Sequence, residues 1–223
     1  MTAKPLLVRA AHLLELPPDA PDNLRIRLQE QYGLDTRRLS PLSRLVLAGA
    51  LPLCPKLPAH SAVYLTVPFG SIHNFKRMWD KLREYQQPSP LDFMAQLHNA
   101  PLFHLAQTAA LHGETIVLTA EAASLLHILD LAAGALHSGS TDSILVGWAY
   151  ERRQPDEPEI SLWWHLTAGN PSDTTTNAPI AALPVGDSFP QSAAALHRQL
   201  LQHGALTLPD SCLWAGQTFK LHA

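Results

Sequence analysis

Apolar residues recur along the chain in two patterns, short runs of strand length and longer stripes with helical spacing. Short runs rich in β-branched and aromatic residues predict strands at Ala62–Val67, Thr115–Leu118, Ser143–Trp148 and Ile160–Thr167, with a last one near Thr218–His222. Helical spacing predicts helices at Leu24–Tyr32, from Asp35 or Thr36 to Gly49, from Gly70 to Leu82, over Leu91–Leu111 with an interruption near Pro101, and at Gln191–Gln202. Strands that alternate with helices predict an α/β fold with a mixed sheet.

One predicted helix is apolar on every side. From Thr119 to Leu136 the chain is nearly all Ala and Leu, with Glu121 and Asp130 as its charged residues. A helix of this kind has to be buried on most sides, so we expect it to be the central helix of the fold.

Two apolar faces suggest packing partners. The helix from Gly70 carries Ile72, Phe75, Met78, Trp79 and Leu82 on one face. The strand Ile160–Thr167 alternates, which is typical of a strand with one better-covered face, and Trp163 lies on the other side. We expect Trp163 to contact a partner.

Composition and charge narrow the class of protein. The chain has 223 residues, 46% hydrophobic and 16% charged, with a net charge of −3. This length is sufficient for one large domain or two small ones, and the charge gives no reason to expect nucleic acid or an anionic membrane as a partner. The basic stretch that contains Lys76, Arg77, Lys81 and Arg83 is interleaved with apolar residues, as in the solvated face of a helix.

The two cysteines and the apolar runs indicate the cellular compartment in which we expect the protein. Cys54 and Cys212 lie far apart and form no C-x-x-C motif, so reduced thiols are expected, with a single long-range disulfide as the alternative. The first residues do not resemble a signal peptide, and no run is apolar enough to cross a bilayer. We therefore expect a soluble cytoplasmic protein.

Common catalytic motifs are missing. The 12 histidines include no helical i, i+4 pair with a suitably placed Glu, so no metal is expected. G-x-S-x-G, G-x-G-x-x-G and the phosphate-binding G-x-x-x-x-G-K are also absent, and no cofactor is expected. Glu121 and Asp130 would lie about 13 Å apart on one helix, too far for concerted acid–base work.

Three stretches, in this order, carry a resemblance to a known family. They are Arg38–Arg44 (RLSPLSR), Ser89–Phe93 (SPLDF) with His98-Asn99-Ala100, and the strand–turn–helix from Gly113 to Leu129 that is closed by Gly139–Gly147. Together they resemble the N-terminal half of a β-ketoacyl synthase of the thiolase-like superfamily. The chain is most similar to the short N-terminal-domain proteins of aryl polyene and related pigment gene clusters.

The resemblance implies a truncated thiolase-like domain. Residues 1–223 would form one ketosynthase-like N-terminal domain, with an N-terminal extension (1–36), a best-matching core (37–150) and a divergent C-terminal part (151–223). Members of the superfamily dimerise through the strand before the nucleophile elbow, which corresponds here to Thr115–Leu118. The resemblance therefore implies a homodimer or a heterodimer with a ketosynthase or ketosynthase-like subunit.

The resemblance also places the nucleophile. An active ketosynthase carries its acyl-accepting cysteine at the N-terminus of the central helix, where the helix dipole favours the thiolate. Counting back from Gly139 places Ala122 at this position, between Glu121 and Ala123, and a methyl group cannot form a thioester. The two histidines of the family come from its C-terminal half, before which this chain ends. We expect the condensing reaction to be absent.

Several residues remain candidates for another role. Glu121 would be stabilised by the helix dipole or act as a base with His98 or His127, and Ser124 is a substitute nucleophile without a visible activating partner. Candidate pocket or interface residues are His98, Asn99, Phe103, Thr119 and Trp163.

Three functions follow from these candidates. The first is a non-catalytic accessory subunit of a fatty-acid or polyene system that contacts a ketosynthase, an acyl carrier protein or an acyl chain. The second is a small acyl-thioester decarboxylase or hydrolase that uses Glu121. The third is a purely structural assembly subunit.

Overall fold

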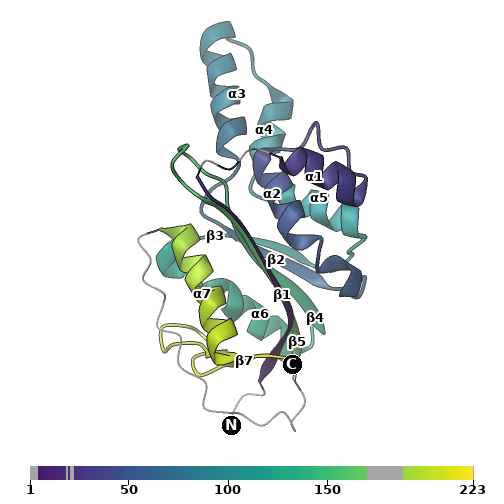
Figure 1. The fold of residues 1–223 in the computed structure, drawn as a ribbon, viewed down its shortest axis with the longest axis vertical. Coiled ribbons are helices and arrows are strands. Elements are labelled where there is room, and N and C mark those ends of the chain that lie inside the picture. The colour runs from purple at the N-terminus through teal and green to yellow at the C-terminus, as the bar shows by residue number, and fades with distance from the viewer. Residues whose placement is uncertain (1–4, 19, 21–22, 170–187, 223) are drawn as a thin grey trace.

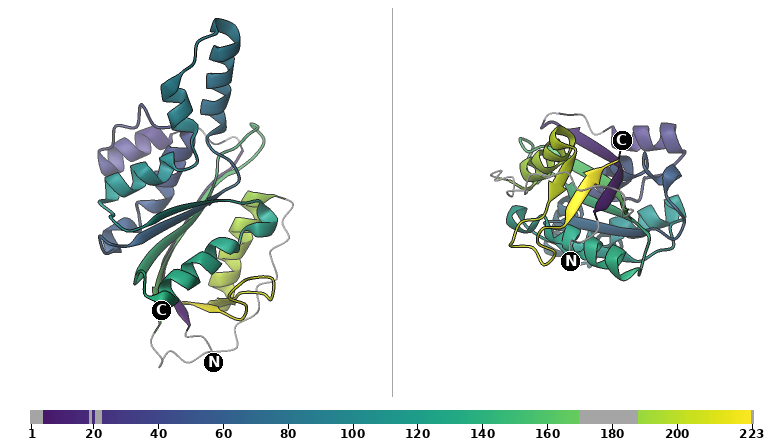
Figure 2. Two further views of the ribbon diagram at one scale, coloured as in Figure 1. Left: turned by 180° about the vertical axis from the view of Figure 1, so that it is seen from behind. Right: turned by 90° about the horizontal axis from the view of Figure 1, so that it is seen from below.

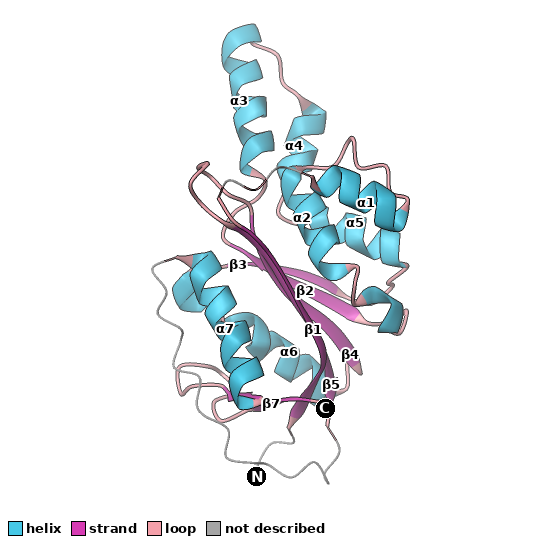
Figure 3. Cartoon of the chain, viewed as in Figure 1, coloured by secondary structure: helices cyan, strands magenta, loops and turns pink. Residues whose placement is uncertain are grey.

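The chain forms one mixed seven-stranded sheet with helices on both faces (Figures 1 and 3). The computed structural model describes residues 5–18, 20, 23–169 and 188–222. The strands are β1 (Leu6–Leu16), β2 (Ala62–Val67), β3 (Thr115–Thr119), β4 (Ser143–Tyr150), β5 (Glu159–Ala168), β6 (Ala205–Thr207) and β7 (Thr218–Leu221). The helices are α1 (Leu24–Tyr32), α2 (Pro41–Ala50), α3 (Ile72–Tyr85), α4 (Pro90–Gln96), α5 (Ala100–Ala109), α6 (His127–Ser138) and α7 (Phe189–His203), with short 3-10 turns η1 (Cys54–Lys56) and η2 (Ala122–Ser124).

The strand order is β3-β2-β4-β5-β1-β7-β6. Strands β3, β2 and β4 are parallel to one another, as crossover helices require, and β5 runs antiparallel to both β4 and β1. Strand β7 is parallel to β1 and antiparallel to β6. The parallel pairing brings the C-terminal ends of β2, β3 and β4 to the same end of the sheet. Strand β3 is an outermost strand.

Two hydrophobic cores lie on the two faces of the sheet. One core packs α6 and α7 against residues such as Tyr64, Trp148 and Trp164, and the other packs α1, α2 and α5 against residues such as Leu65 and Trp163. Alternate residues of each strand supply the two cores, because successive side chains point to opposite faces. The mixed α/β architecture predicted from the sequence is therefore confirmed.

Strand β1 lies within residues 1–36, which were expected to be an N-terminal extension, and the sequence pattern did not predict a strand there. It lies inside the sheet between β5 and β7. A register shift between Val8 and Ala10 interrupts its alternation, which explains why the pattern of apolar positions does not reveal it. The residues from Gly169 to Asn177 are rich in Ser, Thr and Asn, which predicts a loop, and of these residues 170–177 lie outside the described part of the chain.

Trp163 corrects an expectation. The sequence pattern placed it on a poorly covered face, but the side chain is 0% exposed and belongs to the core beneath α2. Its ring lies against Gly147 of β4, where a Cβ would meet it at 2.4 Å, and its Nε1 donates to Ser161 Oγ at 2.9 Å. Both faces of β5 are covered, so Trp163 is a core residue and has no exposed surface with which to contact a partner.

The central helix is shorter and more open than expected. The segment Thr119–Leu136 begins as the end of β3, passes through η2, and becomes α-helical only at His127. The sheet-facing residues of α6, including Leu129 and Ala132, are fully buried, but Leu131 is 42% exposed. Composition alone could not show where the helix starts.

Helices α3 and α4 form an arm that extends beyond the rest of the molecule (Figures 1 and 2). The sequence predicted the apolar stripe of α3 correctly, but this stripe is not part of either core. Phe75 and Trp79 are about half exposed, at 47% and 48%. Helical periodicity identifies an apolar face without showing what covers it.

The cysteines agree with the expectation of reduced thiols. Both are free in the structure, and burial raises the pKa of Cys54 to about 12. Burial, together with the nearby Asp130 carboxylate, raises the pKa of Cys212 to about 11. Among the described helices, none is both long and apolar enough to cross a membrane.

Candidate functional site

The turn after β3, called the elbow below, spans Ala120–Leu126 and contains the position at which the resemblance to ketosynthases implies the nucleophile. The Ala120 N–H donates to the Val67 carbonyl at 3.1 Å, and the Ser124 N–H donates to the Glu121 carbonyl at 3.0 Å. The Leu125 carbonyl accepts a hydrogen bond from Trp148 Nε1 at 2.9 Å. These bonds attach the turn to β2 and β4, so the backbone of the elbow is fixed from both sides.

The side chains at the elbow include no thiol, and Ser124 supplies its one hydroxyl group. Glu121 and Ala123 are exposed, and Ala122 and Ser124 are half-buried. Because α6 begins only at His127, Glu121 does not lie in the first turn of an α-helix, and the expected stabilisation by the helix dipole is not present. Glu121 instead precedes η2 and makes no side-chain hydrogen bond to it.

The candidate partners of Glu121 are not joined to it. His98 and Asn99 lie exposed between α4 and α5, and His127 is exposed at the start of α6. Within residues 23–169, where all of these lie, the structure shows no hydrogen bond or ion pair from Glu121 to His98 or His127. Ser124 likewise has no hydrogen-bonded histidine or carboxylate in that range.

Within the described residues, strand β3 has an unpaired edge beside the elbow. It pairs with β2 on one side only, and its residues Thr115 and Thr119 are exposed while the three between them are half-buried. Phe103, on α5, is 58% exposed, with its ring 5.5 Å from that of His104. The edge strand offers backbone N–H and C=O groups that another strand can pair with.

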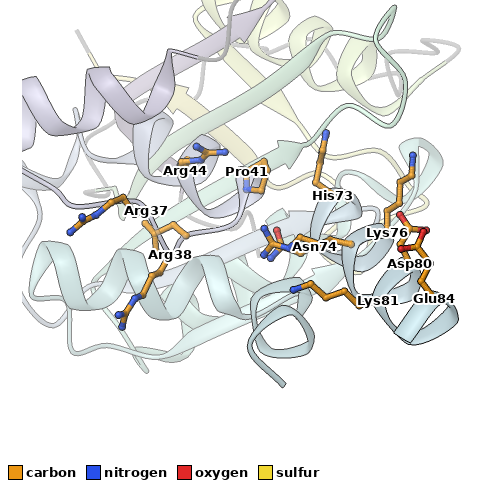
Figure 4. A pocket seen from close by; sticks show the side chains of 12 residues that line it. Arg37, Arg38, Pro41, Arg44, His73, Asn74, Lys76, Asp80, Lys81 and Glu84 are labelled. Atoms are coloured by element: carbon orange, nitrogen blue, oxygen red, sulfur yellow. The ribbon is translucent and has the colours of Figure 1, made fainter. Parts of the chain in front are cut away.

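A basic groove lies between the start of α2 and the first turns of α3. It has a volume of about 540 Å³. Figure 4 shows Arg37 and Arg38 on the segment before α2, and Lys76 on α3. Lys81 also lines the groove, as do two acidic residues of α3, Asp80 and Glu84. The groove combines residues that the sequence offered separately, and only the fold brings them together.

A buried carboxylate lies beside this groove. Glu151 is 0% exposed, and its Oε1 accepts hydrogen bonds from the backbone N–H of His73 at 3.0 Å and from His73 Nδ1 at 2.7 Å. Its Oε2 has no hydrogen-bond partner among the described residues. The pair attaches the first turn of α3 to the end of β4. No pattern in the sequence indicates that Glu151 is buried, because residues 151–159 are polar and predict a loop.

Solved structures share this fold. The chain matches a structure titled "Ketosynthase (ApeO) in Complex with its Chain Length Factor (ApeC) from Xenorhabdus doucetiae" with a TM-score of 0.64 and 18% identity, covering 91% of this chain and 94% of that one. It matches "The ishigamide ketosynthase/chain length factor" with a TM-score of 0.59 and 16% identity, over 90% of this chain and 74% of that one. A third match, at 13% identity and a TM-score of 0.57, is an acyl-carrier protein in complex with its ketosynthase, "AntDE:AntF (apo)", over 74% of this chain and 63% of that one.

These matches show that the chain shares the fold of solved ketosynthase structures. No curated protein matches the chain. The family model described as "Beta-ketoacyl synthase, N-terminal domain" matches residues 16–183. The chain therefore belongs to the β-ketoacyl synthase N-terminal domain family, as its motifs suggested.

Proposed function

We propose that the chain is a non-catalytic, ketosynthase-like subunit that pairs with a catalytic ketosynthase in a fatty-acid or aryl polyene type of biosynthetic system. The observation that carries the proposal is Ala122 in the turn between β3 and α6, at the position where the resemblance to ketosynthases implies the acyl-accepting cysteine. Without a thiol, the elbow would not carry out the reaction itself. The open edge of β3 can pair with a strand of a partner, so both features support a subunit that assists a catalytic partner.

The structural match supports this pairing. Coverage of 91% of this chain and 94% of the matched chain means that the two are nearly equal in length. That chain belongs to a complex of a ketosynthase with its chain length factor. We propose the corresponding role for this chain, with strand β3 at the subunit interface.

Co-expression tests the pairing. A tagged form of this chain is expressed with the ketosynthase encoded nearest to its gene and purified through the tag. We expect a 1:1 complex by light scattering, and we expect condensing activity in the complex but not in this chain alone. If the tag retrieves neither the ketosynthase nor a carrier protein, the accessory role is wrong.

Two variants separate this proposal from the alternative of a small thioester-cleaving enzyme. Ala122→Cys introduces a thiol, but we expect no condensing activity from the isolated chain, because no histidine of the described residues is hydrogen-bonded to the elbow. Glu121→Ala should leave the activity of the complex unchanged. Loss of a thioester-dependent activity with an intact fold would favour an enzyme that uses Glu121.

We also propose that the basic groove binds an acyl carrier protein through acidic residues of the carrier. Within the described part of the chain neither Arg38 nor Lys76 has an ion-pair partner, so both cations are available to a charged surface. Arg38→Glu with Lys76→Glu should weaken carrier binding and reduce its salt dependence. Arg198→Glu, an exposed position on α7, is the matched control.

A further inference from the structure

A buried histidine joins helix α7 to the sheet. His197 of α7 is 7% exposed, and its Nδ1 accepts a hydrogen bond from Trp164 Nε1 at 3.3 Å. Trp164 lies on β5, is 0% exposed and belongs to the core beneath α6 and α7. An indole N–H can only donate, so Nδ1 of His197 carries no proton and the ring is neutral, with its proton on Nε2. The bond therefore exists only while the ring is neutral.

Protonation of His197 would remove this bond and add a buried charge. A proton on Nδ1 would bring two N–H donors face to face, and a charged ring is costly in an apolar core. Burial lowers the pKa of His197, and the nearby His12 and Arg198 lower this pKa further. The folded state therefore strongly favours the neutral ring.

The elements that pack against α7 offer no compensating negative charge. Helix α7 packs against β4, β5, β6, β7 and η2. The titratable side chains of these elements are Tyr150, Glu159, His165 and Lys220. Within the described residues, none of them forms a hydrogen bond or an ion pair with His197, and the carboxylate of Glu159 is paired with Arg152 at 3.1 Å.

A second buried histidine shows that burial alone does not create this sensitivity. His165 of β5 is also 7% exposed, and burial together with Arg9 lowers its pKa. Its Nε2, however, bonds to Ser143 Oγ at 2.9 Å. A hydroxyl group can accept as well as donate, so this bond can persist when the ring is protonated. Only His197 faces a partner that must donate.

Helix α7 covers one face of the sheet and part of the elbow. It lies beside α6 on this face (Figure 1), and Phe189, Leu196 and Leu200 belong to the core there. The ring of Phe189 stacks on that of Tyr150 with 6.2 Å between the centroids. The helix also packs against η2, the central turn of the elbow. Detachment of α7 would therefore uncover both the core and the elbow.

We propose that His197 is a pH-sensitive switch: the neutral ring holds α7 on Trp164, and protonation favours a state in which α7 has detached from the sheet. The proposal does not depend on the pairing with a ketosynthase. In the detached state the ring takes up a proton near the ordinary histidine pKa of about 6.5, whereas the attached state resists protonation. Detachment should therefore become easier as the pH falls below about 6.5, and it should be nearly independent of pH above about 7.5.

Hydrogen exchange of the isolated chain tests the proposal. Amide exchange is measured by mass spectrometry at pH 7.5 and 5.5 and corrected for the intrinsic pH dependence of exchange. We expect residues 189–203 of the wild type to open about 10-fold more often at pH 5.5, because this pH lies one unit below the pKa of the free ring, and β2 to be unchanged. His197→Asn keeps an acceptor for the indole without a titratable group and should abolish the increase. His165→Gln is the matched control and should retain it.

The outcomes are distinct. An equal increase in wild type and His197→Asn, an equal increase in α7 and β2, or no increase in the wild type would each overturn the proposal. If His197→Asn does not fold, Trp164→Phe provides a second test, because it removes the donor that opposes the proton. The NMR titration midpoint of the His197 ring should then be higher than in the wild type, and an unchanged midpoint would overturn the role of Trp164 in the switch.

Discussion

Asp92 of α4 is 2% exposed and accepts hydrogen bonds from Lys81 Nζ, Arg77 Nε and Ser89 Oγ, so this cluster allows the stability of the arm to be tested separately from that of the sheet. Asp92→Asn keeps the shape of the side chain but removes the charge that two cations share. Hydrogen bonds to charged groups contribute about 1.5–3 kcal/mol each to stability. The contribution from Arg77 and Lys81 is smaller, because their side chains are 59% and 46% exposed and water solvates them when the bonds break. We expect a loss of about 2 kcal/mol in the free energy of opening the arm.

Hydrogen exchange measured by mass spectrometry reads this change directly. A loss of about 2 kcal/mol raises the opening equilibrium about 30-fold, so amides within 72–96 should exchange about 30-fold faster. Amides of β4 and β5 should keep their rates, because α3 packs mainly against α4. Asp156→Asn, at an exposed acid in the β4–β5 loop, is the control.

The effect should depend on pH in one direction. Burial alone would raise the pKa of Asp92, but the hydrogen bonds from Lys81, Ser89 and Arg77 outweigh it and hold the pKa of this carboxyl well below its usual value. The ionised group therefore stabilises the arm above about pH 4, and this contribution is lost as the pH falls through the lowered pKa. In the hydrogen-exchange experiment, Asp92→Asn could instead accelerate amide exchange equally in the arm and the sheet, or leave exchange in the arm unchanged. Either result would refute the proposed role of Asp92.

Three further predictions concern the body of the molecule. Gly147→Ala should destabilise the fold by about 3 kcal/mol or prevent folding, because the new methyl group overlaps the buried indole ring of Trp163. Gly134→Ala on α6 should instead stabilise the fold by about 0.5–1 kcal/mol, because the helix has room for the methyl group. Urea unfolding measures both changes. Glu151→Ala should lower the free energy of unfolding by about 1–3 kcal/mol, because the first turn of α3 loses its acceptor, and unchanged stability would contradict that role. Cys54 and Cys212 should react slowly with a thiol reagent at pH 8 in the native protein and fast in urea, because their raised pKa values suppress the thiolate.

The sequence correctly predicted those helices and strands that are defined by neighbouring residues in the chain. The strand at Ala62–Val67 and the helix at Leu24–Tyr32 have the predicted bounds, because apolar runs and breaking residues lie next to one another in the sequence. Strand β7, in contrast, pairs with β1 from the opposite end of the chain, and its position in the sheet depends on packing that no short window contains.

The candidate site was predictable in its chemistry and less so in its geometry. The absence of a thiol at Ala122 follows from counting residues. The start of α6 at His127 does not, because a run of Ala and Leu is compatible with a helix at any of its positions. Glu151 could not be identified either, since its burial depends on the helix that follows β2.

The open edge of β3 also affects the chain before it assembles. A free strand edge can pair with any other exposed strand, including that of an identical chain, and natural proteins usually protect such edges. If β3 is the interface, each copy is exposed to self-association from synthesis until it meets its partner. The two subunits should then be produced in matched amounts, and excess copies of this chain should aggregate or be degraded.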